Sequence, residues 1–122
     1  MSWTVNIDLI KDWLDEQDLD IAIDIGSAID KLREEGPNLG RPMVDVIHGS
    51  RLHNLKELRP YTRAGTEVRI LFIFDPLRSA VFLVAGDKSA GKSVTRKWNG
   101  WYRRAIPQAE KVYRQYLKER GL

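Results

Sequence analysis

The chain contains no cysteine, and this absence removes several kinds of chemistry at once. Disulfide bonds, cysteine zinc sites and thiol catalysis are excluded, so packing alone must hold the core together. Long apolar runs are missing too: no stretch approaches the ~20 residues that span a membrane, and the N-terminus has no basic segment followed by an apolar one. We therefore expect a cytoplasmic protein that does not associate with membranes.

The length of 122 residues, of which 43% are hydrophobic, predicts one globular domain covering residues 1–122. A net charge of +3 hides an uneven distribution, because Lys11 is the only basic residue in an acidic segment of 30 residues. Residues 88–104 contain no acid, and aromatic side chains lie among their six cations. This mixture favours binding to phosphates and unstacked bases. The alternative is a solvated segment whose rings turn into the core.

Hydrophobic spacing predicts a strand at 3–7, a helix beginning at Asp8, and a second helix from about 18 to 36. Residues 37–54, rich in proline and glycine, predict a long irregular connection. Strands are expected at about 55–60, 67–74 and 80–87, with connections short enough for hairpins. A last helix at about 107–120 would have Pro107 in its first turn. The expected fold class is α+β: an N-terminal strand and helical hairpin, an antiparallel β-meander sheet and a C-terminal helix.

The strand expected at 67–74 has two different faces. Because side chains alternate along a strand, one face is wholly apolar and the other is charged at its start. The first holds Val68, Ile70, Phe72 and Phe74, and the second holds Glu67, Arg69, Leu71 and Ile73. We expect the apolar face to be core and the other to be available for chemistry. The structural alternative is a salt-bridge lattice between strands, Glu57 with Arg69 or Glu67 with Arg59.

Residues 86–93, GDKSAGKS, match the phosphate-loop pattern G-x-x-x-x-G-K-[ST]. That motif requires a parallel α/β sheet and a helix that opens directly after the loop. Here the preceding strands look hairpin-linked, and residues 94–97 offer little helix before Asn99 and Gly100. A nucleotide-binding protein using residues 86–93, with Asp75 as a partner for magnesium, is therefore the less favoured interpretation.

Five separate sequence motifs are typical of one known family: LGRP at 39–42, NLKELR at 54–59, EVRILF at 67–72, GDK at 86–88, and WY with AIP at 101–107. In these motifs and in the order of its expected strands and helices, the chain resembles the RelE/ParE superfamily of toxins from bacterial toxin–antitoxin modules. The resemblance is greatest to the phage-derived HigB-like branch. Residues 89–97 depart from it, since the family's link there is usually shorter.

The resemblance implies the toxin of a type II module, a metal-independent endoribonuclease without cofactor. Such a toxin cleaves mRNA, commonly on the ribosome, and a helix-turn-helix antitoxin neutralises it. The chemistry needs a base for the 2′-hydroxyl proton, cations for the charge on phosphorus, and a donor for the leaving 5′-oxygen. Arg69 matches the family's phosphate-contacting arginine, and its guanidinium fork fits two phosphate oxygens. Lys88 is a further catalytic candidate, and Glu57 and Glu67 compete as the base.

Candidate RNA contacts come from several parts of the chain. They are Lys56, Arg59, His53, Lys92, Arg96, Lys97, Trp101 and Tyr102. Lys56 should point to the strand face opposite Glu57, and either contacts a phosphate or is solvated. Histidine is a common acid or base in catalysis, but His48 and His53 lie in a stretch typical of surface residues. Trp101 and Tyr102 fit base stacking or core packing. The alternative function is a non-catalytic toxin of the same fold that inhibits a host enzyme such as gyrase.

Overall fold

A five-stranded sheet forms the centre of the protein, in a computed structural model that describes residues 2–87 and 94–122, the side chains of residues 94–99 excepted. The strand order is β1-β5-β4-β3-β2. The bounds are β1 (Thr4–Asn6), β2 (Val44–Val46), β3 (Lys56–Leu58), β4 (Val68–Phe74) and β5 (Ser79–Asp87). Strands β3, β4 and β5 pair antiparallel, and β1 pairs parallel with β5 at the edge. The predicted meander is confirmed.

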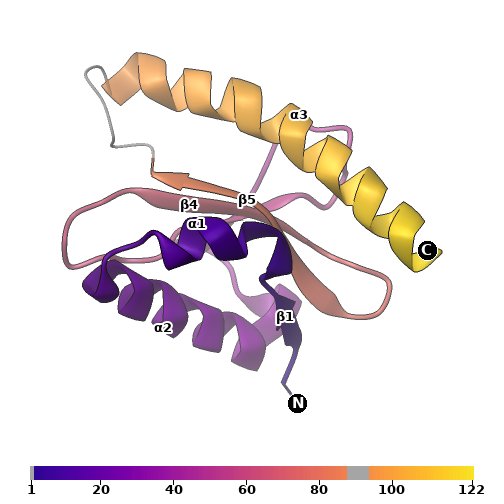
Figure 1. Ribbon diagram of the computed structural model, residues 1–122, viewed down its shortest axis with the longest axis horizontal. Coiled ribbons are helices and arrows are strands. Elements are labelled where there is room, and N and C mark those ends of the chain that lie inside the picture. The colour runs from indigo at the N-terminus through magenta and orange to yellow at the C-terminus, as the bar shows by residue number, and fades with distance from the viewer. Residues whose placement is uncertain (1, 88–93) are drawn as a thin grey trace.

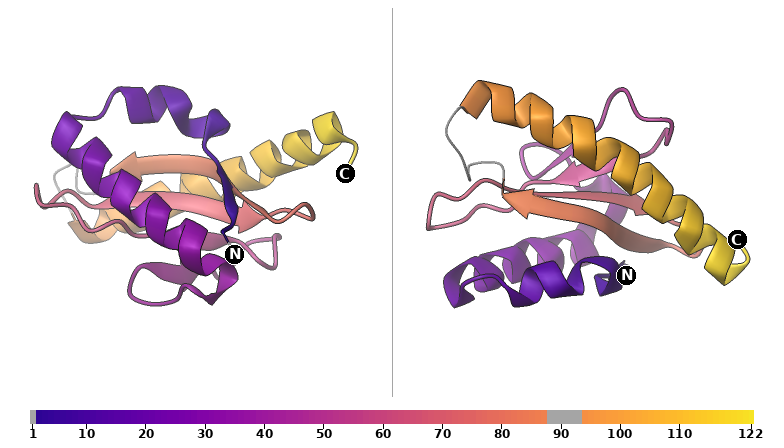
Figure 2. Two further views of the ribbon diagram at one scale, coloured as in Figure 1. Left: turned by 90° about the horizontal axis from the view of Figure 1, so that it is seen from below. Right: turned by 45° about the horizontal axis from the view of Figure 1, so that its top comes forward.

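Helices cover both faces of the sheet (Figures 1 and 2). A 3-10 turn at Asp8–Ile10, helix α1 (Lys11–Asp15) and helix α2 (Leu19–Glu35) lie on one face, and helix α3 (Val94–Arg120) crosses the other. The α+β class is thus confirmed. Among the described residues, no helix is long and apolar enough to cross a membrane.

The alternation along β4 produces two cores. Val68, Ile70 and Phe72 pack with residues of α2 in the first core, and Leu71 and Ile73 pack under α3 in the second. The contacts from α3 are Ala105, Ala109, Tyr113 and Tyr116. The expectation that the whole second face is open is therefore wrong, because α3 buries Leu71 and Ile73; Glu67 and Arg69, near the start of β4, stay partly exposed.

Two boundaries differ from the sequence prediction. The connection at 37–54 contains strand β2, which pairs with β3 at the edge of the sheet. Helix α3 begins at Val94, so Pro107 lies inside it and not in its first turn. An interior proline costs about 3 kcal/mol, and burial of the apolar side of α3 on the sheet offsets this cost.

The early start of α3 removes one reason for rejecting a phosphate loop. Residues 94–97 are helical, contrary to expectation, although residues 88–93 lie outside the described part of the chain. The other reason stands, because β5 pairs antiparallel with β4. Asp75 serves the β4–β5 turn: its carboxylate accepts the backbone N–H groups of Leu77 and Ser79 at 2.9 and 2.8 Å and the Tyr116 hydroxyl at 2.7 Å.

Candidate active site

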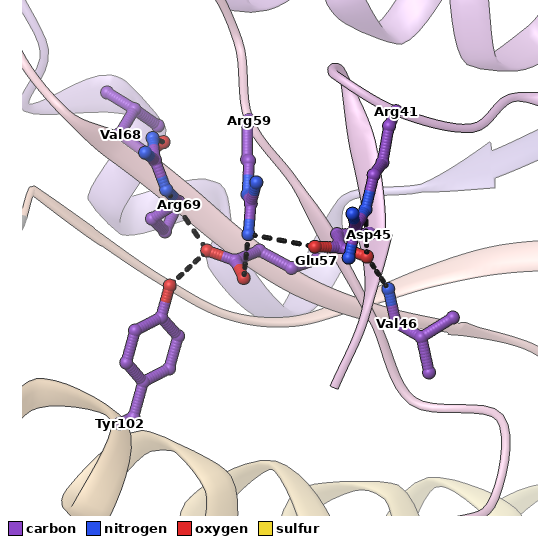
Figure 3. A network of polar contacts seen from close by, with 8 residues as sticks. All are labelled: Arg41, Asp45, Val46, Glu57, Arg59, Val68, Arg69 and Tyr102. Carbon is purple, nitrogen blue, oxygen red and sulfur yellow. Dashed lines mark hydrogen bonds and ion pairs between the residues drawn. The ribbon is translucent and has the colours of Figure 1, made fainter. Parts of the chain in front are cut away.

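A buried carboxylate, Glu57 of β3, lies at the centre of a polar network (Figure 3). Its side chain is only 2% exposed. Arg69 Nε lies 3.0 Å from its Oε1, Arg59 Nη2 lies 3.6 Å from its Oε2, and the Tyr102 hydroxyl donates to Oε1. Both carboxylate oxygens are therefore engaged, which compensates the charge that burial would otherwise penalise.

The network extends to the edge of the sheet through the second arginine. Arg59 Nη2 lies 3.2 Å from Asp45 Oδ2, and Arg41 Nε lies 3.1 Å from Asp45 Oδ1. The hydrogen bond from Arg41, joined by the backbone N–H of Val46, lowers the pKa of Asp45 below its usual range. Three guanidinium groups thus meet two carboxylates, and the network keeps an excess of positive charge that suits a bound phosphate.

The strand register explains how these side chains meet. Glu57 pairs with Leu71, so Arg69, two residues before Leu71, lies on the same face one step along β4. Arg59 lies on that face as well, because it follows Glu57 by two residues. Arg69 itself pairs with Gly86 of β5. A Cβ at Gly86 would collide with the indole of Trp101, so this glycine allows α3 to approach the sheet and bring Tyr102 over Glu57.

Two clefts open on either side of this network. The first has a volume of about 680 Å³ and lies between the segment at 49–51 and α3, with Tyr102, Arg103 and Arg114 in its wall. The second, of about 510 Å³, is lined by Arg59, Arg69 and the segment that joins β3 to β4. Glu57 is thus linked to the first cleft through Tyr102 and to the second through both arginines.

The floor of the first cleft is fixed by Glu110, a buried residue of α3. Its Oε2 accepts the Ser50 hydroxyl at 2.8 Å and the backbone N–H of Arg51 at 2.6 Å. The Arg51 N–H is the main cause that lowers the pKa of this carboxyl. Glu110 therefore holds the segment at 49–51 against α3.

The structure brings together Glu57, Arg59, Arg69 and Tyr102, and places Glu67 in the second cleft beside both arginines. The Glu57–Arg69 pair expected from a salt-bridge lattice is present. Lys56 points to the other face, as predicted, with Nζ 5.5 Å from the centre of the Phe74 ring. That position separates it from Glu57.

Other predicted contacts lie elsewhere. His48 and His53 are exposed in the segment before β3, and Trp101 packs against the second core. Lys88 and Lys92 lie outside the described residues, as do the side chains of Arg96 and Lys97. Within residues 2–87 and 94–122, no three His, Cys, Asp or Glu side chains gather as a metal site would require.

Sequence reasoning missed Arg41 and Asp45. Arg41 belongs to the LGRP motif, and Asp45 follows Arg41 by four residues. Asp45 reaches Arg59 because β2 pairs with β3, with Asp45 opposite Glu57. The strand was not predicted, so nothing in the sequence placed this carboxylate beside the others.

Because of the Tyr102 hydroxyl, the stability of the fold should decrease at alkaline pH. Burial, and then the bond to Glu57, raise the pKa of Tyr102 above its usual value of about 10. As pH rises, the unfolded chain loses this proton before the folded chain does. The contribution of Tyr102 to the free energy of unfolding should therefore be constant below about pH 10 and decrease above it. Tyr102→Phe should reduce that slope by up to about 1.4 kcal/mol per pH unit, as measured by urea unfolding between about pH 9 and 11. An unchanged slope would contradict the placement of Tyr102.

Comparison with known proteins gives concordant matches. The family described as phage derived protein Gp49-like matches residues 12–114. The chain is 40% identical over 119 residues to "Putative toxin HigB2" of Mycobacterium tuberculosis, covering 98% of the chain and 56% of that protein. It is 43% identical over 108 residues to "Putative toxin HigB3" of the same organism, covering 88% of the chain and 87% of the relative. The chain thus spans little more than half of the first relative.

Proposed function

The chain belongs to the phage-derived Gp49-like family of HigB-type toxins, and from this premise we propose that it is an endoribonuclease that cleaves mRNA without a metal ion, on the ribosome. The observation that supports this proposal most is the second cleft, where Arg59 and Arg69 share a wall with Glu67. Cations and a carboxylate on one accessible surface are what cleavage by the 2′-hydroxyl requires.

The roles of the two carboxylates follow from their surroundings. Glu57 is almost fully buried and engages two guanidinium groups and a hydroxyl, so it orients the arginines. Glu67 is half-buried and lines the cleft, where a bound RNA reaches it without displacing Tyr102. We assign Glu67 as the base.

In the proposed reaction Glu67 takes the 2′-hydroxyl proton and the 2′-oxygen bonds to phosphorus. Arg69 and Arg59 stabilise the charge on the phosphate oxygens. The bond from phosphorus to the 5′-oxygen then breaks, and that oxygen takes a proton from a donor for which Lys88 is the candidate. The products are a 2′,3′-cyclic phosphate and a 5′-hydroxyl end. Lys88 follows Asp87, which ends β5 opposite Val68.

The proposed partner is a small helix-turn-helix antitoxin that covers the cationic face. Support for it comes from the relatives, named as toxins of the HigB type, and from the charge distribution. Acidic residues gather in the first 30 positions, so the rest of the chain carries the positive charge. A partner with acidic side chains would associate quickly with such a surface.

Purified protein should cleave RNA in the presence of EDTA and leave 2′,3′-cyclic phosphate ends. Glu67→Gln should lower kcat by about 10²–10⁴-fold, the usual contribution of a general base. Cleavage is measured on labelled RNA, and adding the purified antitoxin should stop it. Arg33→Ala, an exposed arginine of α2 on the opposite side of the sheet, is the matched control.

Three outcomes would count against the proposal. Cleavage that requires Mg²⁺ would show that the reaction is not metal-independent. Intact RNA together with inhibited supercoiling by gyrase would support a non-catalytic toxin. Thermal stabilisation by ATP or GTP that is lost in Lys92→Ala would support a nucleotide site at residues 86–93.

A further inference from the structure

The second cleft has an apolar wall and an exposed aromatic ring that the proposed chemistry does not use. Pro42, Met43 and Pro60 form the apolar part, and Arg59, Arg69 and Glu67 form the polar end. Tyr61 also lines the cleft, yet 78% of its surface is exposed. The cleft thus joins an exposed flat ring and an apolar wall to the two guanidinium groups that would hold a phosphate.

The segment that carries Tyr61 is tied down at several points. The buried Thr62 hydroxyl donates to the Thr66 carbonyl at 2.7 Å, and Gly65 adopts a positive φ of 76° that closes the turn. The backbone N–H of Arg63 donates to Asp24 Oδ2 of α2 at 2.9 Å, and Arg63 Nε lies 3.2 Å from Asp24 Oδ1. Hydrogen bonding to the Arg63 N–H lowers the pKa of Asp24, which keeps this anchor charged at neutral pH.

These hydrogen bonds and the ion pair fix the backbone that carries the Tyr61 ring. Residues on both sides of the turn are bonded to each other, and the turn is bonded to α2, so Tyr61 starts from an ordered backbone. A ligand that stacks on the ring then loses little additional backbone entropy on binding. An exposed tyrosine alone would need no explanation. One fixed at the rim of a cleft beside two partly buried arginines, Arg59 and Arg69, is suited to a planar anionic ligand.

We propose that this cleft is a nucleobase subsite, in which the base next to the scissile phosphate stacks on Tyr61. Its phosphate then contacts Arg69 and Arg59 at the polar end of the same cleft. This inference rests on the proposed ribonuclease function and adds the residue that holds the substrate base. The cleft volume of about 510 Å³ accommodates a single base.

The ligand class follows from the combination of surfaces. Aromatic stacking is favourable for every base, and the apolar wall of Pro42, Met43 and Pro60 offers the base further nonpolar contact. A phosphate alone would use the arginines and leave Tyr61 without a role. An acidic peptide of the antitoxin is the competing occupant, and the experiment below separates it from RNA.

The test uses short RNAs with a 2′-deoxy group at the cleavage position, which blocks attack on phosphorus but allows binding. One set carries an abasic residue on either side of that position. Removing the stacked base should weaken binding to the parent protein by about 5- to 150-fold, the range for one base on one aromatic ring. Tyr61→Ala should weaken binding of the intact RNA by the same factor and show no further loss with the abasic RNA. Fluorescence anisotropy measures each Kd.

Two variants serve as controls. Tyr61→Phe keeps the ring and should bind as the parent does. Leu77→Ala removes another exposed apolar side chain, in the β4–β5 turn away from the cleft, and should change nothing. The slope of log Kd against log salt should be unchanged in Tyr61→Ala, because stacking releases no counterions.

The results distinguish this inference from the proposed function. Normal cleavage by the parent, together with unchanged binding by Tyr61→Ala, would overturn the subsite and leave the ribonuclease standing. Loss of antitoxin affinity in Tyr61→Ala with RNA binding intact would assign the cleft to a protein partner and also overturn it. A parent that neither binds nor cleaves RNA would refute both.

Discussion

Replacing Arg69 by alanine should abolish the toxicity of the protein while the chain stays folded. The substitution removes the guanidinium that faces Glu57 at 3.0 Å and lines the cleft proposed for the scissile phosphate. Charge stabilisation at phosphorus is then lost, and the loss of one such donor costs about 10²–10³-fold in kcat. Growth inhibition on induction and RNA cleavage in vitro measure the effect.

The fold should survive because Glu57 keeps two of its partners. Arg59 and the Tyr102 hydroxyl still reach its oxygens after Arg69 is removed. Breaking a buried ion pair costs about 3–5 kcal/mol when the remaining charge is left alone, so the loss here should be smaller. Cooperative unfolding by circular dichroism should persist at a lower melting temperature.

Arg69→Lys separates charge from geometry. A lysine keeps the positive charge but cannot contact Glu57 and two phosphate oxygens with one planar group. Activity should therefore be only partly restored. A fully toxic Arg69→Ala protein would show that the assignment of the active site is wrong.

Replacing Phe72 by alanine should instead unfold much of the population. Phe72 has no exposed surface. The centre of its ring lies 5.6 Å from that of Phe74, in an edge-on arrangement, and 5.8 Å from that of Phe82, whose ring is tilted to it. Truncating a buried phenylalanine costs about 3–5 kcal/mol, a large part of the ~5–15 kcal/mol by which a domain is stable. Urea unfolding at neutral pH measures the change.

Phe74→Ala is the matched control for this substitution. Phe74 lies two residues further along β4 on the same face but is only partly buried. Its truncation should cost clearly less than that of Phe72. Equal losses for the two variants would contradict the position of the first core.

The sequence alone predicted the elements that local spacing encodes. Apolar residues at three- and four-residue intervals marked α2, and its end at Gly36 has a local reason, because this glycine has a positive φ of 55°. Alternation predicted the two faces of β4 and the position of Lys56 on the face opposite Glu57. These periods depend only on how side chains leave a regular backbone.

Other features depend on contacts between distant parts of the chain. Strand β2 is three residues long and exists because β3 offers an edge to it, so Asp45 could not be placed beside Arg59 in advance. Helix α3 continues through Pro107 because its apolar side is buried on the sheet, which no local signal reveals. That packing brings Tyr102 across 45 residues to Glu57.

Residue types and their order along β3 and β4 determined which charged groups meet at the candidate site: Glu57 contacts Arg59 and Arg69, and Glu67 lines a cleft with both arginines. The tertiary structure decided which carboxylate is accessible: it buries Glu57 between arginines and under α3, and leaves Glu67 and Tyr61 in an open cleft. Burial is a property of what packs above a strand. The sequence of the strand itself cannot specify it, because the covering helix comes from another part of the chain.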